Sequence, residues 1–245
     1  MIVGFCGSGN MAAAMARGWA GEFESMLFSD NGSGKAQALA SELGGEAVGN
    51  AALAERSDFV VLAVKPAGLE GVAPDLAAAA RVVSILGATS LERLRSALPG
   101  AEILRVMPNV GVEVRQGVLC LAGDAGAEAR EKLRLLGHVV EIADGEFDEA
   151  TAIMGCAPAY LALVVEALAD AGTAAGLDAA LARELVVETA AGTAELLRTR
   201  DAAEVREAVT SPGGSTEAGL EALDREGARE AFAAAVAASL ERMRG

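Results

Sequence analysis

Residues 58–64, DFVVLAV, and 81–86, RVVSIL, are mostly apolar and do not alternate between polar and apolar side chains. A strand with one face in water alternates, whereas a strand that is covered on both faces of a parallel sheet does not. We therefore expect a doubly wound α/β sheet with helices on both sides. Further strand candidates are residues 1–6, 26–30, 102–107, 117–123 and 138–143, the last two at one edge of the sheet. Helical spacing occurs at residues 10–20, 35–43 and 68–80.

The character of the sequence changes after about residue 146. Strand-like runs stop there, and Ala, Leu and Glu dominate the remainder. The 245 residues leave room for two modest domains. We predict a Rossmann-type dinucleotide-binding domain over residues 1–146 and an all-α dimerisation domain over residues 147–245. The expected helices of the second domain are 148–176 with a kink at Pro158, 178–199 with Asp178 as N-cap, 201–209, 216–227 and 228–244.

Residues 161–168, LALVVEAL, are apolar nearly all round. A helix of this composition must be buried on several sides, and a helical domain of about 100 residues offers few such positions. Burial against a second copy of the chain explains the pattern economically. We expect a homodimer or a larger homo-oligomer that is built from dimers.

The formal net charge of -15 argues against partners that are themselves anionic. Such a chain repels phosphate backbones and anionic lipid, so we expect no binding to nucleic acid or to a membrane. The apolar runs contain charges and are too short to span a bilayer, and the N-terminal MIVGFC resembles a strand more than a signal peptide. Three scattered cysteines and the single His138, expected on the surface at a strand start, favour the cytoplasm and disfavour a metal site or a Ser-His-Asp hydrolase.

The segment GFCGSGNMA at residues 4–12 has the spacing Gly-x-Gly-x-x-Ala between the first strand and the first helix. This is the context of a dinucleotide fingerprint: the first glycine permits a tight turn, and the second lets the pyrophosphate approach the backbone. Ala12 would keep helix and strand close, and the helix N-terminus would face the phosphates. The candidate cofactor contacts in this turn are Gly7, Ser8, Gly9, Asn10 and Met11.

The ends of later strands carry further polar candidates. Asp30 ends the second strand, where it would accept a hydrogen bond from the ribose 2′-hydroxyl of NAD and repel the 2′-phosphate of NADP. Ser29, Asn31, Ser33 and Lys35 could soften that preference, and Asp30 could equally cap a turn. The cofactor is NAD or NADP. Lys65 in AVKP and Asn109 in VMPN also follow strands and would face the ligand crevice.

A loop near the C-terminus, TSPGGST at residues 210–216, combines hydroxyl groups with a flexible backbone before a helix. Its glycines allow amides to point inward as an anion site, and the following helix adds the positive end of its dipole, with Ser215 or Thr216 as cap. Taken alone, the loop could also be a flexible linker.

Five segments in this order resemble the pyrroline-5-carboxylate reductase family: GFCGSGNMA, AVKP, RVMPN, GCAPAYLALVVEALADAG and VTSPGGSTEAGLEAL. The resemblance implies an NAD(P)-binding domain, an interlaced helical dimer and hydride transfer from the nicotinamide to 1-pyrroline-5-carboxylate, giving proline. It also implies site residues. Ser211, Gly213, Gly214 and Ser215 would bind the substrate carboxylate, Thr216 would bind the ring nitrogen as the catalytic residue, and Asn50, Ala63, Val64, Lys65, Pro66, Gly87, Ala88 and Asn109 would contact the cofactor.

The sequence departs from the family pattern at three places. Val110-Gly111 stands where the family has Thr-Pro, Leu86-Gly87-Ala88 replaces Ala-Ala-Gly, and Cys156-Ala157 replaces Ser-Gly. Two alternatives to a pyrroline-5-carboxylate reductase therefore stay open. One is a diverged imine reductase for another small cyclic imino acid, and the other is a weakly active nucleotide-binding homologue with a regulatory role.

Overall fold

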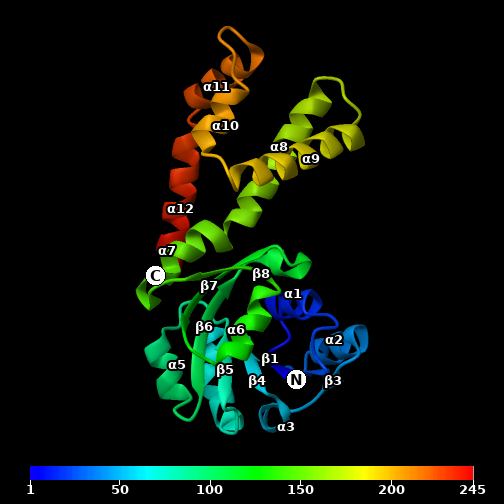
Figure 1. The fold of residues 1–245 in the computed structure, drawn as a ribbon, viewed down its shortest axis with the longest axis vertical. Coiled ribbons are helices and arrows are strands. Elements are labelled where there is room, and N and C mark those ends of the chain that lie inside the picture. Colours follow the sequence, from blue (N-terminus) through cyan, green and yellow to red (C-terminus); the bar gives the residue numbers. More distant parts are fainter. Residues whose placement is uncertain (245) are drawn as a thin grey trace. The chain divides into compact units, whose positions relative to one another are not determined.

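The computed structural model describes residues 1–244 (Figure 1). The chain forms two compact units, one made of Met1–Pro158 with the last residues from Met243 onward, and the other made of Ala159–Arg242. The division falls inside helix α8 (Ala157–Ala174), which begins in the first unit. The functional boundary at 146/147 stays a prediction.

An eight-stranded sheet carries the first unit, in the order β3-β2-β1-β4-β5-β6-β7-β8. Neighbouring strands run parallel except for β6 and β7. The chain moves from β1 outwards to β3 and then returns to β4 on the other side of β1, and ligands bind at the carboxyl ends of strands at such a reversal. The strands are β1 (Ile2–Cys6), β2 (Ser25–Ser29), β3 (Glu46–Ala47), β4 (Phe59–Leu62), β5 (Arg81–Ser84), β6 (Glu102–Pro108), β7 (Gly117–Gly123) and β8 (Gly137–Glu141).

Helices cover both faces of this sheet (Figure 1). On one face, helices α1 (Asn10–Gly18), α2 (Lys35–Leu43) and α6 (Ala127–Arg134) pack in a core that contains Phe5, Trp19 and Phe28. On the other face, α3 (Asn50–Arg56), α4 (Leu69–Val72) and α5 (Leu91–Ala97) pack in a core that contains Leu53 and Leu94. Because both faces are buried, the interior strands show no polar alternation, and the predicted doubly wound fold is confirmed.

Some elements of the first unit differ from the sequence-based expectations. The helix expected at 68–80 is broken into the short 3₁₀ helix η1 (Pro66–Gly68), α4 and a second 3₁₀ helix η2 (Ala73–Leu76). Pro66 and Pro74 stand in the first turns of these pieces, where proline is tolerated but starts a new helix. The sequence analysis did not identify the short elements β3, α3, α5 and α6. β7 and β8 extend the sheet at one edge, as expected, and His138 is exposed on β8.

The long helix expected at 148–176 is interrupted. It consists of α7 (Phe147–Ala150), a π-helical turn η5 (Thr151–Gly155) and α8, with Pro158 in the first turn of α8. The remaining helices agree with the expectation, and Asp178 caps α9 by accepting from Ala180 and Leu181. They are α9 (Ala179–Leu197), α10 (Ala202–Ala208), α11 (Ser215–Arg225) and α12 (Ala228–Arg244).

The second unit has almost no core of its own. Of the described residues 159–242, only Ala182 is buried. Large apolar side chains of α8 are exposed to solvent instead. The exposed fraction is 64% for Leu161, 63% for Leu163 and 56% for Leu168. A helical unit that buries so little apolar surface lacks the main source of folding stability.

The helical segment Asp144–Ala174 is 31 residues long and apolar enough to cross a membrane by length and composition, with 6% of its most apolar window buried. This segment is longer than the apolar runs of the sequence because it continues on both sides of Pro158, and the expectation of no membrane partner stays a prediction. Length and composition do not distinguish a membrane span from a helix that is covered by a second subunit.

Candidate functional site

The turn after β1 is the first part of the candidate site. Gly7 has a φ of 101°, and its N–H donates to the Ser29 carbonyl at 3.1 Å, which also accepts from Ser8 Oγ at 2.9 Å. A Cβ on Gly7 would lie 2.7 Å from the carbonyl carbon and oxygen of Ala63. Only glycine fits this conformation and this spacing, so β1 and β4 approach closely at the reversal of strand order.

Helix α1 starts directly at this turn and leaves its first amides free. Its N-cap is Gly9, and no side chain caps it. No protein atom lies within 4 Å of the Cβ position on Gly9, whereas Ala12 is packed with 1% exposure. Uncapped amides at Asn10 and Met11, the positive end of the helix dipole and open space fit a phosphate group. The residues present therefore fit a dinucleotide.

Gly9→Ala is expected to weaken dinucleotide binding by about 10-fold or more, because the new methyl group occupies the space through which the pyrophosphate approaches the backbone. Stability should change by less than about 1 kcal/mol, since Gly9 has an ordinary φ of -77° and its Cβ meets nothing. Titration with NADH, followed by fluorescence, and thermal unfolding measure the two effects. Gly100→Ala, whose Cβ also meets nothing, is the control; equal affinity in both variants would contradict the assignment.

The end of β2 places Asp30 in a network of hydrogen-bond donors. Its Oδ1 accepts from the N–H of Gly32 at 2.8 Å, and its Oδ2 accepts from Ser33 Oγ at 3.0 Å and from the N–H of Ala36 at 2.8 Å. These hydrogen bonds, the one from Ala36 foremost, hold the pKa of Asp30 below its ordinary value, so the side chain is ionised at neutral pH. Asp30 therefore caps the turn and the start of α2, as one of the two sequence interpretations expected.

Asn50, at the start of α3, is held by three side chains. Its Oδ1 accepts from Ser29 Oγ at 2.7 Å and from Cys6 Sγ at 3.5 Å, and its Nδ2 donates to Asp75 Oδ2 at 3.2 Å. Burial raises the pKa of the Cys6 thiol to about 11, so the thiol keeps its proton and remains a donor. The sequence analysis did not predict a role for Asp75, on η2, because its contact with Asn50 depends on the fold.

The loops after β4 and β5 bring the next candidates to the same edge of the sheet. The N–H of Ala63 donates to the Cys6 carbonyl at 2.8 Å, which places the residues Ala63, Val64, Lys65 and Pro66 beside the turn after β1. Lys65 is exposed. Ala88 has a φ of 48°, a left-handed conformation that costs a side-chain-bearing residue roughly 1–2 kcal/mol. Ala88 stands where the family pattern has glycine, so the backbone there keeps a conformation that glycine adopts freely.

Asn109 has a structural role at the end of β6. Its Oδ1 accepts from the N–H groups of Gly111 at 3.2 Å and Val118 at 3.1 Å, and its Nδ2 donates to the Met154 carbonyl at 3.2 Å. These bonds cap the 3₁₀ helix η3 (Val110–Val114) and connect it to η5. A contact between Asn109 and the cofactor stays a prediction.

The loop at residues 210–216 belongs to the second unit. Gly214, rather than Ser215 or Thr216, is the N-cap of α11, so the expected hydroxyl cap was wrong. Gly213 has a φ of 73°, and its N–H donates to Glu217 Oε2 at 2.6 Å. The backbone here thus already binds one carboxylate, from the chain itself, and the sequence analysis had not identified Glu217.

Three of the four hydroxyl groups of this loop, those of Ser211, Ser215 and Thr216, make no hydrogen bond within the described residues. The fourth, Thr210 Oγ1, donates to the Arg206 carbonyl at 2.6 Å. The side chains of Ser211, Ser215 and Thr216 are all exposed. Free hydroxyls beside the first amides of a helix can hold a small carboxylate.

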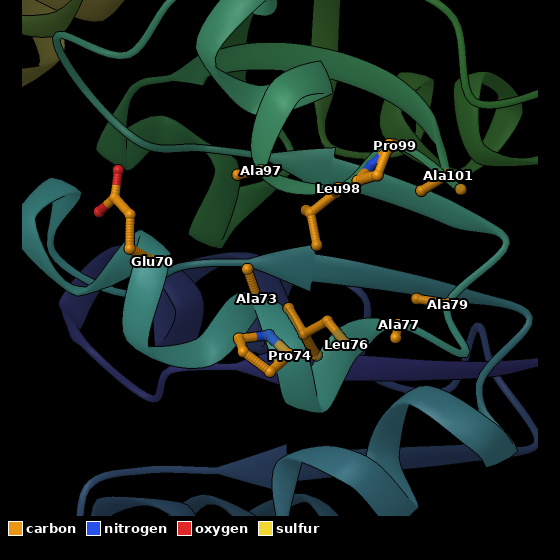
Figure 2. Close-up of a pocket in the computed structure, with 11 residues that line it drawn as sticks. Glu70, Ala73, Pro74, Leu76, Ala77, Ala79, Ala97, Leu98, Pro99 and Ala101 are labelled. Carbon is orange, nitrogen blue, oxygen red and sulfur yellow. The ribbon is translucent and has the colours of Figure 1, made fainter.

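The first unit also contains a pocket away from the candidate dinucleotide site. A pocket of about 420 Å³ lies at the amino ends of β5 and β6, opposite the edge that carries Gly7 and Asp30. Figure 2 shows its mostly apolar lining, with Glu70 at one end; that carboxylate pairs with Arg93 at 2.7 Å. Within residues 1–244, no cluster of three or more His, Cys, Asp or Glu side chains could hold a metal ion.

Known proteins resemble this chain along its whole length. Residues 144–245 match the family model for pyrroline-5-carboxylate reductase dimerisation, and residues 2–87 match the model for NADP oxidoreductase, coenzyme F420-dependent. A pyrroline-5-carboxylate reductase of Synechocystis sp. is 39% identical over 204 residues, which cover 79% of this chain and 76% of the relative. The chain belongs to the pyrroline-5-carboxylate reductase family.

Solved structures of the pyrroline-5-carboxylate reductase family agree with the fold. The enzyme from Streptococcus pyogenes is 30% identical with a TM-score of 0.90, over 99% of this chain and 98% of that chain. The Plasmodium falciparum pyrroline carboxylate reductase, whose structure has NADP bound, is 27% identical with a TM-score of 0.86, over 99% and 97%. The family that the sequence motifs predicted is confirmed.

Proposed function

We propose that the protein is a pyrroline-5-carboxylate reductase, which reduces the C=N bond of 1-pyrroline-5-carboxylate to give L-proline. The observation that carries this proposal is 39% identity to a reductase of this name over 79% of the chain, with the motif loop at 210–216 present. The fold belongs to an NAD(P)-dependent oxidoreductase that acts on a C=N bond. Bound at the edge of β1 and β4, the dinucleotide would supply the hydride.

The residues of the second unit would position the substrate. The Ser211 hydroxyl and the amides of Gly214 and Ser215 would hold the carboxylate, with the helix α11 dipole adding a favourable potential. The Thr216 hydroxyl would hydrogen-bond the ring nitrogen. A cyclic imine is readily protonated, and its iminium carbon accepts hydride without a strong acid, so positioning and charge compensation are the main tasks of the protein. Such a site needs no histidine.

Steady-state reduction of 1-pyrroline-5-carboxylate with NADH and with NADPH tests the proposal. Robust turnover supports it. Turnover only with other cyclic imines would support a diverged imine reductase; the replacement of the family threonine by Val110, which is 53% exposed, favours this second candidate. Dinucleotide binding without turnover would support the other alternative, a nucleotide-binding homologue with a regulatory role.

The assembly and the location are part of the proposal. The near absence of buried residues in Ala159–Arg242, and the description of the matching family model as a dimerisation region, support a homodimer. The three cysteines are free, which is consistent with the reducing cytoplasm. The partners would be the small imino acid and proline.

Glu217→Gln is expected to lower KM for the substrate about 5-fold at unchanged kcat. The Glu217 carboxylate accepts from the Gly213 N–H, and a negative charge there opposes a second carboxylate by about 1 kcal/mol at a partly exposed site. Steady-state kinetics at saturating cofactor measure the change. Glu221→Gln, one turn further on the same helix, removes the same charge and should leave KM unchanged. An equal effect of both variants would contradict a local role for Glu217.

A further inference from the structure

We infer that Arg105 and Asp144 are positioning residues for the nicotinamide half of the dinucleotide, because together they fix the loop at residues 85–90. Neither residue is among the candidate contacts of the sequence analysis. The inference rests on the proposed dinucleotide site, and it names two side chains that act on the cofactor through that loop. Each of its parts lies in the first unit.

The loop at residues 85–90 follows β5 at the carboxyl edge of the sheet. Strands β4 and β5 lie on the side of β1 that is opposite to β2. In this kind of fold the ribose of the adenosine half is bound near the end of the second strand, and the pyrophosphate lies at the turn after the first strand. The nicotinamide half would therefore extend over β4 and β5 to this loop.

The strained backbone of Ala88 indicates that neighbouring contacts hold this loop in one conformation. Ala88 has a left-handed φ of 48°. A residue with a side chain keeps such a backbone only where its surroundings impose it, and such residues cluster at ligand sites. Two contacts impose it here. The buried Thr89 hydroxyl donates to the Gly87 carbonyl at 2.9 Å, and the N–H of Leu91 donates to Asp144 Oδ2 at 3.1 Å.

Asp144 comes from a distant segment and is held in place by Arg105. Arg105 Nη1 donates to Asp144 Oδ1 at 2.7 Å and to the Asp144 carbonyl at 3.1 Å. Within residues 1–244, these are the side-chain hydrogen bonds of Arg105, and its guanidinium carbon lies 3.9 Å from the centre of the Phe147 ring. One carboxylate therefore joins β6 to the first residue of α5, Leu91.

The burial of this ion pair points to a role in conformation rather than in stability. The side chain of Arg105 is 5% exposed and that of Asp144 is 32% exposed. Desolvation of a buried cation offsets much of its attraction to the carboxylate, so an apolar pair of similar size would stabilise the fold as well. An apolar side chain at position 144 could not accept from the Leu91 N–H. The ion pair thus fixes the start of α5, and with it the strained loop.

Titration of NADH and of ADP-ribose onto the full chain, without substrate, tests the inference. ADP-ribose lacks the nicotinamide ring, so its affinity reports on the rest of the site. Arg105→Met should weaken NADH binding about 10-fold, which corresponds to one or two lost hydrogen bonds, and should change ADP-ribose binding by less than about 2-fold. NADPH and ADP-ribose 2′-phosphate serve the same purpose if NADPH is the tighter ligand.

Asp144→Asn keeps the test valid if Arg105→Met does not fold. Asn offers one acceptor oxygen where the carboxylate offers two, so it cannot serve both Arg105 Nη1 and the Leu91 N–H as the carboxylate does. The position is partly exposed, so the variant should fold. It should also weaken NADH binding and leave ADP-ribose binding unchanged.

Ala88→Gly supplies a readout that a purely structural role would not move. Glycine adopts a φ of 48° without steric cost, so the loop would keep its shape without the ion pair. In the Ala88→Gly background, Arg105→Met should therefore weaken NADH binding by about 2-fold or less. A loss in this background as large as in the wild type would show that Arg105 does not act through the strained loop, and would overturn the inference.

The matched control is Arg81→Met. Arg81 stands at the start of β5, at the other end of the strand from the loop, and it pairs with Glu128 at 2.8 Å and with Glu102 at 3.7 Å. The control removes the same charge and an ion pair of the same kind, so it should leave both affinities unchanged. A loss of NADH affinity equal to that of Arg105→Met would mean that overall charge sets the affinity, and would contradict the inference.

Two further outcomes separate this inference from the proposed function. If Arg105→Met weakens NADH and ADP-ribose equally, or weakens neither, the inference is wrong even if 1-pyrroline-5-carboxylate is reduced efficiently. A selective loss of NADH affinity, in a protein that fails to reduce that substrate, upholds the inference and refutes the proposed reaction.

Discussion

Thr216→Ala is expected to lower kcat for the reduction of 1-pyrroline-5-carboxylate by about 10²-fold while the affinity for NADH stays the same. Removal of one oriented donor at a reacting centre typically costs this much. The Thr216 hydroxyl is exposed and, among the described residues, has no protein partner, so its loss removes no internal hydrogen bond. Stopped-flow or steady-state kinetics give kcat, and fluorescence titration gives the NADH affinity.

Two neighbouring variants make this experiment decisive. Thr216→Ser keeps the hydroxyl and should retain most of the activity. Thr210→Ala removes a hydroxyl that is already bound to the Arg206 carbonyl, and it should change kcat little. If Thr216→Ala kept its activity, or if it lost NADH binding to the same degree as turnover, the hydroxyl would not act on the substrate.

Leu161→Asp is expected to convert the proposed homodimer into monomers at micromolar concentration and to lower the thermal stability of the protein. Leu161 is 64% exposed in a single chain and lies on the same face of α8 as Val164 and Leu168, so a partner that covers this face would bury the new carboxylate. The transfer of a leucine side chain contributes roughly 1.5–3 kcal/mol, and burial of an unpaired charge costs more. In a two-fold symmetric dimer the substitution occurs on both subunits.

Sedimentation velocity and calorimetry test this result. Leu135→Asp is the control, because Leu135 is an exposed leucine of the first unit, at the end of α6, and the same change there should leave the oligomeric state intact. A wild-type protein that sediments as a monomer, or a Leu161→Asp variant that remains a dimer, would show that this face of α8 is not the interface. The proposed assembly would then be wrong.

The sequence pattern predicted the first unit well because its signals are local. A strand that is buried on both faces must be apolar throughout, and a turn in which a Cβ would lie 2.7 Å from another backbone can only be glycine. The sequence analysis did not identify the short helices α3, α5 and α6, although the buried Leu91, Leu94 and Leu98, in and directly after α5, follow a helical spacing that could have been found. Their helical state depends on packing against the sheet.

The contacts of the candidate site could be predicted only in part. Gly7, Gly9 and Asp30 stand at places where strand, turn and helix follow one another, so the sequence alone predicted them as candidate cofactor contacts. Asp75 contacts Asn50 across 25 positions of the chain, and no spacing rule connects the two. The buried Arg105 similarly reaches Asp144 at 2.7 Å over 39 positions and stacks on Phe147 at 3.9 Å, which anchors the start of the helical segment.

The sequence by itself determined the doubly wound sheet, the helical second half, the dinucleotide turn and the hydroxyl loop, because each follows from the chemistry of adjacent residues. Only the tertiary structure decided which groups form hydrogen bonds with one another. It assigned the N-cap of α11 to Gly214, gave the Gly213 amide to Glu217 and joined Asn50 to Asp75. The contact between Asn50 and Asp75 depends on the distance between segments 25 positions apart in the chain, on which a linear pattern carries no information. The contact between Gly213 and Glu217 is local, but it depends on the left-handed backbone at Gly213, which the residue types alone do not specify.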